Sequence, residues 1–226
     1  MPLMPAGSLT AEIFSLLAII ALILSFVMLG SHWIHNHIYA FALESWVIAA
    51  LSAAIGVYGH YPELLFIAAL TVLFRGSLLP YLLLRIVDRL EIRREFAPAL
   101  RPSSSMVLGA MLVLFSYAVS EHLGARMGLA GPIAILALTT LFALTLIGFL
   151  MLILRSEAVS HILGLLVIEN GIFLGAQILV PGMPILLELV ILFDLLIIVS
   201  TFGLLVRFLK TVVGTTDTRE LNRLVG

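Results

Sequence analysis

Apolar residues run along this chain in seven stretches, each long enough to cross about 30 Å of hydrocarbon as an α-helix. Short segments that contain Gly, Pro or polar residues separate them, among them GSHWIHN, GHYPE, LAGP and PGMP. The pattern therefore predicts an all-α, polytopic integral membrane protein with about seven transmembrane helices. The predicted spans cover residues 9–30, 36–58, 63–86, 105–122, 131–154, 159–180 and 184–209, and the fourth is the shortest.

One linker between predicted spans is long, polar and basic. It has the sequence RIVDRLEIRREFAPALRPSSS and covers residues 85–105. We expect it to continue the third helix out of the membrane and to break at Pro98 and Pro102. It divides the chain into a three-helix N-terminal part with this linker, residues 1–104, and a four-helix C-terminal part with a short tail, residues 105–226.

The distribution of Lys and Arg predicts the orientation, because loops on the cytoplasmic side carry an excess of both. With seven spans and the N-terminus outside, the outer side receives Arg126 and the cytoplasmic side, where the C-terminus lies, receives the other ten basic residues near span ends. Those ten are Arg85, Arg89, Arg93, Arg94, Arg101, Arg155, Arg207, Lys210, Arg219 and Arg223.

Composition supports this class and removes several functions. Hydrophobic residues make up 62% of the chain and charged residues 11%, which no soluble globular domain approaches. The net charge of −1 gives no reason to expect nucleic acid as a partner, and the absence of Cys excludes cysteine-ligated iron–sulfur clusters within this chain. The six His lie near predicted span ends, which favours interfacial positions. A retinal protein is disfavoured because Lys210, at a span end, is the sole Lys.

Five charged residues nevertheless fall inside the apolar spans. A charge at the bilayer centre costs about 2.5–3.5 kcal/mol even on the mildest insertion scale, so such residues usually have a function. Four carboxyl groups and one guanidinium suggest proton handling. The alternative is that they only join helices to one another or to partner subunits. The five are Glu44, Arg75, Glu169, Glu188 and Asp194.

Glu44 and Arg75 lie on consecutive antiparallel spans at similar depth, about 12 Å and 16 Å from the cytoplasmic helix ends. We expect an ion pair between them, because the charge of an Arg cannot be removed by deprotonation. The pair either fastens two helices together or lets Arg75 tune a nearby proton-carrying carboxylate. Pro80 is expected to kink the third span and to free a backbone carbonyl.

Glu169 is the strongest candidate proton carrier, at about 16 Å depth and next to Asn170. Gln177 and His161 on the same span would add polar support, while glycines allow close helix approach. The alternative role for Glu169 is a single hydrogen bond across a helix interface. On the last span Glu188 and Asp194 are about 120° apart around the helix, so they face different neighbours. Asp194, at mid-depth, is the better proton carrier of the two.

The segments FALTLIGFLMLILRSEAVSHILGLLVIENGIFL and GLLVRFLK, within residues 130–210, resemble the K subunit of respiratory complex I, a membrane subunit of three helices. With VIENGIFL, FDLLIIVSTFGLLVRF and the preceding helices, the whole chain resembles component E of hydrogenase-4 and formate-hydrogenlyase-type complexes. In the K subunit, two buried Glu belong to the proton path. Glu169 resembles the first, about one turn later. Asp194 resembles the second when GLLVRFLK is aligned, and Glu188 when the helix starts are aligned.

The resemblance implies a membrane-arm subunit of an energy-converting redox complex of the membrane-bound hydrogenase type, in a prokaryotic inner membrane. Glu169, Asp194, Glu188 and Glu44 would then contribute to a proton-translocation path, and Arg75 would tune it. The subunit would hold no cofactor and would not be catalytic alone, with nickel–iron and iron–sulfur centres in its partners. Those partners would be antiporter-like and other membrane subunits and a soluble redox arm on the cytoplasmic side. A subunit of a multisubunit cation/proton antiporter and a non-conducting assembly scaffold are the alternatives.

Overall fold

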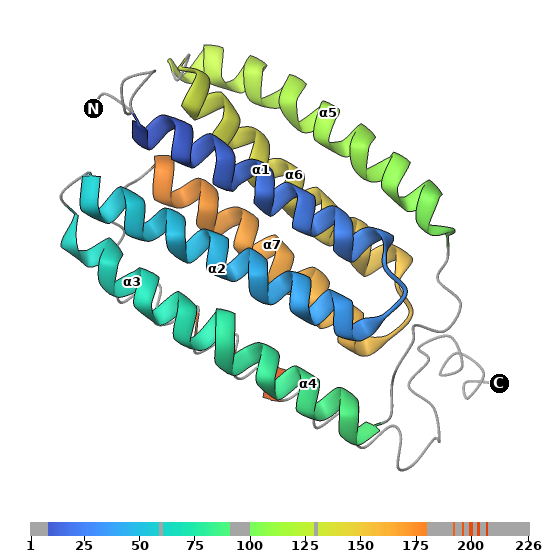
Figure 1. Ribbon diagram of the computed structural model, residues 1–226. Helices are drawn as coiled ribbons and strands as arrows, with labels where there is room; N and C mark the ends of the chain where they lie inside the picture. The colour runs from blue at the N-terminus through green and yellow to red at the C-terminus, as the bar shows by residue number, and fades with distance from the viewer. Residues whose placement is uncertain are drawn as a thin grey trace.

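The described part of the computed structural model is a bundle of long helices (Figure 1). It covers residues 9–58, 61–90, 100–128 and 131–179, together with positions 192, 196, 199, 200, 203 and 207. The helices are α1 (Leu9–Gly30), α2 (Ile34–Tyr58), α3 (Pro62–Leu73), α4 (Leu79–Leu90), α5 (Pro102–Met127), α6 (Pro132–Leu154) and α7 (Ala158–Leu179), with a π-helical segment, η1 (Phe74–Leu78), between α3 and α4.

The helices lie in layers. The pairs α1 with α6 and α2 with α7 form the middle of the bundle, while α5 packs against α6 and α1 on one side and α3, η1 and α4 pack against α2 on the other (Figure 1). The two parts on either side of the basic linker therefore share one core, because α1 and α2 of the first part contact α6 and α7 of the second.

The all-helical fold class expected from the sequence is confirmed for the described residues. The described residues contain helices and no strands, and five spans are long and apolar enough to cross a membrane. Six of the expected spans coincide with helices, where α3, η1 and α4 together form the third span and α7 carries a shorter apolar stretch. The seventh expected span, residues 184–209, lies outside the described residues except for the six single positions, which are helical.

Helix boundaries follow local chemistry. Pro62, Pro102 and Pro132 occupy first turns, where a missing N–H group has no helical partner to lose. At the other end of α5, Gly128 takes a φ of 71° and donates its N–H to the carbonyl of Gly124. A left-handed residue at this position is the usual glycine stop signal, and it ends the helix there.

The fourth span is longer than expected, since α5 has 26 residues against the 18 of residues 105–122. Its bundle-facing side consists of small residues, while large apolar side chains such as Met111, Leu114 and Phe115 are exposed. Small residues let helices approach closely in a bilayer, and exposed apolar ones suit contact with lipid. The buried small residues are Ser105, Gly109, Ser116, Ser120 and Gly124.

Candidate functional site

The third span carries a π-helical segment at the level of its buried charge. In η1 the Leu79 N–H donates to the carbonyl of Phe74, five residues earlier, which is the π-helical pattern. Pro80 follows directly and has no N–H to donate to the carbonyl of Gly76, four residues before it. The indole Nε1–H of Trp46 on α2 donates to that carbonyl at 3.2 Å. The carbonyl that we expected Pro80 to free is thus that of Gly76, and it accepts a hydrogen bond from Trp46 of α2.

Arg75 sits inside this segment and points into the bundle. It is 1% exposed. Its Nη2 lies 3.4 Å from Oε2 of Glu169, its Nη1 donates to Oδ1 of Asn170 at 3.3 Å, and its guanidinium carbon lies 5.2 Å from the centre of the Phe173 ring. These three partners come from one face of α7, so the third span and α7 meet around a buried cation.

Glu44 belongs to the same group of residues although it makes no ion pair with Arg75 in this arrangement. Its carboxyl group is completely buried, and neither oxygen has a partner within hydrogen-bonding geometry. The side chain of Asn170 is the polar group that acts electrostatically on the Glu44 carboxyl. Its donor atom, Nδ2, also has no partner within hydrogen-bonding geometry. Asn170 therefore stands between Glu44 on α2 and Arg75 on the third span.

The expected partner of Arg75 is thus wrong. The sequence favoured Glu44 because the two residues lie on consecutive spans, whereas the guanidinium of Arg75 contacts Glu169 and Asn170 on α7. The reason is the layered packing, in which α2 contacts both the third span and α7 and leaves both within reach of Arg75. The ion pair that the structure does show for Arg75 is the 3.4 Å contact of its Nη2 with Oε2 of Glu169.

The other expected site residues do not join this group. His161 lies in the first turn of α7, where its Nδ1 donates to the backbone carbonyl of Glu157 at 2.9 Å, two turns from Glu169. Position 177 belongs to α7, but the side chain of Gln177 lies outside the described residues, as do Glu188 and Asp194.

A second buried polar group, which the sequence did not reveal, lies where the α1–α2 and α6–α7 turns meet. Arg155 is 7% exposed, and its Nη2 donates to the carbonyls of Met28 and Leu29 at 3.0 and 2.7 Å, at the C-terminal end of α1. His37 is completely buried and donates from Nε2 to the carbonyl of Ser31 at 2.9 Å. His37 keeps the expected place near a span end, in the first turn of α2, but its side chain is completely buried.

The group of Arg75, Glu169, Asn170 and Glu44 has to balance its charges in a medium of low dielectric constant. One guanidinium compensates one carboxylate, and a second ionised carboxyl group would add an uncompensated charge. Glu44 and Glu169 can therefore hold one exchangeable proton between them, with Arg75 and Asn170 fixing the geometry. The described part of the chain contains no cluster of His, Asp and Glu able to hold a metal ion.

The described residues thus form an all-helical protein with helices long and apolar enough to cross a membrane and with a buried, partly compensated charge group. The chain is similar to an uncharacterized protein, Rv0085, of Mycobacterium tuberculosis. The two are 29% identical over 184 residues, which cover 81% of this chain and 82% of that protein. No family model matches the chain. No solved structure matches it either.

Proposed function

We propose that this chain is a membrane-arm subunit of an energy-converting redox complex of the membrane-bound hydrogenase type, in a prokaryotic inner membrane. Its task there is to contribute buried carboxyl groups to a proton-translocation path. It carries no redox centre, and its partners are antiporter-like membrane subunits and a soluble redox arm on the cytoplasmic side. The resemblance of residues 130–210 to a proton-path subunit supports the type of complex.

The observation that carries the proton-path role is the meeting of Arg75, Glu169, Asn170 and Glu44 from three helices in the interior of the bundle. A buried pair that only fastened helices would need one carboxylate for one guanidinium. This group places a second carboxyl, completely buried, beside the shared Asn170. Ionisable side chains inside a membrane bundle commonly belong to proton relays, and an extra titratable site beside a fixed cation is what a relay requires.

Substitution Glu169→Gln tests this role within the assembled complex. Gln keeps the shape and a hydrogen-bonding group but cannot exchange a proton, so we expect normal assembly with reduced proton translocation and, where coupling is tight, reduced electron transfer. Glu169→Asp keeps a titratable group and should retain part of the activity. Outside the described residues, Asp194→Asn should resemble Glu169→Gln, and Glu188→Gln should be milder.

A matched control is Glu121→Gln, which removes a carboxyl group from the exposed surface of α5. This variant should pump normally. Purification of the tagged chain in mild detergent identifies the complex by the redox subunits that accompany it. An assembled Glu169→Gln complex that pumps at the normal rate would favour a scaffold, and a cation requirement without any redox partner would favour a cation/proton antiporter.

A further inference from the structure

Helices α2 and α7 both carry buried polar atoms that have no hydrogen-bond partner among the described residues. Buried polar groups in proteins are almost always bonded, and ordered water is the usual partner where protein groups do not supply one. On α2 these atoms are His37 Nδ1, both carboxyl oxygens of Glu44 and Ser45 Oγ, and on α7 they are Ser160 Oγ and Asn170 Nδ2.

These atoms fall at two levels of the bundle. Helices α2 and α7 start at the same end of the bundle, where Arg155 in the α6–α7 turn donates to the last carbonyls of α1. The depth of a residue in either helix can therefore be measured from its helix start. At about 1.5 Å per residue, His37 and Ser160 lie about 3–5 Å from the helix starts. Glu44 and Asn170 lie about 15–18 Å from them, which agrees with the proximity of these two side chains.

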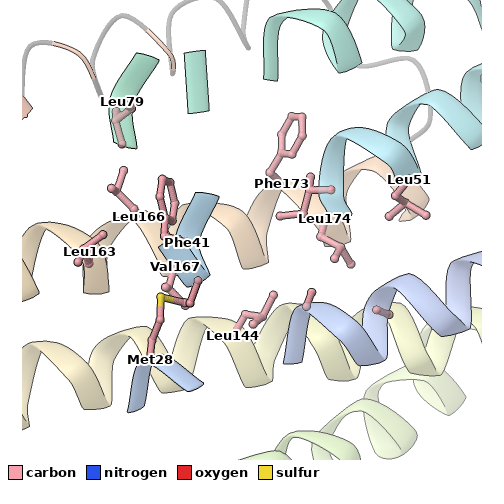
Figure 2. Packing of buried hydrophobic residues seen from close by; sticks show 14 of the residues in the cluster. Met28, Phe41, Leu51, Leu79, Leu144, Leu163, Leu166, Val167, Phe173 and Leu174 are labelled. Carbon is pink, nitrogen blue, oxygen red and sulfur yellow. The ribbon is translucent and has the colours of Figure 1, made fainter. Parts of the chain in front are cut away.

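An apolar layer about 10 Å thick separates the two levels. On α2 it contains Phe41, which is completely buried and lies on the same face as His37 and Glu44. Figure 2 shows Phe41 among Leu163, Leu166 and Val167 of α7, all of which belong to the same buried cluster. An apolar layer of this kind passes protons only when water enters it.

The hydrogen bond of His37 determines which of its ring nitrogens carries the proton. Because a carbonyl can only accept, Nε2 must carry the proton that is donated to Ser31, and in the neutral ring Nδ1 is then a proton acceptor. The charged or titratable groups that bear on His37 are Arg155 from the α6–α7 turn and His32 from the α1–α2 turn. His32 is exposed and lies five residues before His37, in the α1–α2 turn.

We propose that His37 is a second proton-exchange site of this protein, which serves Glu44 across the Phe41 layer. This proposal adds an entry site to the proposed proton path, and the direction of proton transfer rests on that proposed function. A solvent proton binds Nδ1 and forms the imidazolium beside Arg155, where like-charge repulsion favours its onward release. When water enters the layer, the Nδ1 proton passes through it to the Glu44 carboxylate. His37 then returns to the neutral ring with Nε2–H still bonded to Ser31.

Proton influx into liposomes that contain the purified full-length chain and a trapped pH dye tests the pathway. Phe41→Ala should hydrate the layer and raise influx several-fold over wild type. Adding His37→Gln, which retains a donor toward Ser31, should return influx to the wild-type level. His35→Gln is the matched control, since His35 is two residues away and bonded at the surface to Asp88 at 2.9 Å. It should leave the raised influx unchanged. Equal influx with and without His37→Gln overturns the proposal.

A second measurement does not depend on the Phe41 variant being folded. In nitrogen-15 spectra of the full-length chain in lipid nanodiscs, the ring signals that disappear in His37→Gln belong to His37. Polarisation transfer from water should reach its unprotonated Nδ1 in the wild-type protein. If no water signal reaches that nitrogen, His37 exchanges no proton with the interior and the proposal fails. A complex that pumps normally with Glu169→Gln would instead refute the proposed function and leave the His37 result standing.

Discussion

The contact between Arg75 and Glu169 can be measured as a coupling free energy with the variants Arg75→Met, Glu169→Gln and both together. Breaking a fully buried ion pair costs about 3–5 kcal/mol. An exposed pair contributes about 0.2–1 kcal/mol. Here the side chain of Arg75 is 2% exposed and that of Glu169 is 21% exposed. The 3.4 Å between Nη2 and Oε2 is longer than a close charge-assisted hydrogen bond. We therefore expect a coupling of about 1–2 kcal/mol, between these limits.

The assay is reversible unfolding of the full-length chain in mixed micelles by increasing denaturing detergent. Trp46 is a suitable reporter because it contacts η1 directly, and Trp33→Phe in the parent removes the second indole. The same cycle with Glu44→Gln in place of Glu169→Gln is the control, for which we expect a smaller coupling since Glu44 bears on Asn170 and not on Arg75. Additivity within about 0.3–0.5 kcal/mol for Arg75 with Glu169 would refute the pairing.

Three further outcomes are expected. A Cys at exposed Ser104 should react with an impermeant reagent from the cytoplasmic side and one at exposed Gly131 from outside; the reverse pattern would invert the topology. Pro80→Ala restores an N–H for the carbonyl of residue 76, so α-helix should replace η1 and Trp46 emission should shift to longer wavelength; unchanged emission contradicts the assigned cause. Gly148→Leu should destabilise the chain by at least about 1–3 kcal/mol in the micelle assay, because a Cβ there would meet an α7 backbone oxygen at 2.6 Å.

Helix positions could be predicted because apolar length and the residues that end helices are local properties. Six expected spans coincide with helices, and the glycines on α7 make the expected close approach, with Gly175 against Leu141 and Gly164 against the backbone of Gly148. The length of α5 was underestimated because its polar ends contain Ser, Glu and His, which lower hydropathy without ending a helix.

The partner of Arg75 could not be predicted from chain order. Depth along the span placed Glu44 and Glu169 both within about 4 Å of Arg75, so depth alone left the choice open. Adjacency in sequence favoured Glu44, and it failed because nonconsecutive helices can also be neighbours in a bundle. The surroundings of His37 depend in the same way on a distant residue, Arg155, whose charge acts on the ring and for which the local sequence carries no signal.

The backbone of the third span explains why the charge group forms where it does. Pro80 removes a helical hydrogen bond, η1 absorbs the irregularity, and Trp46 satisfies the carbonyl that is released. The segment that carries Arg75 is thereby fixed against α2, the helix that also carries Glu44. Asn170 then links the two sides, since its Oδ1 accepts from the cation while its side chain acts electrostatically on the Glu44 carboxyl without a hydrogen bond of good geometry. In the proposed proton path, transfer between Glu44 and Glu169 would change which carboxylate the cation compensates, and Asn170 is the side chain that would couple the two.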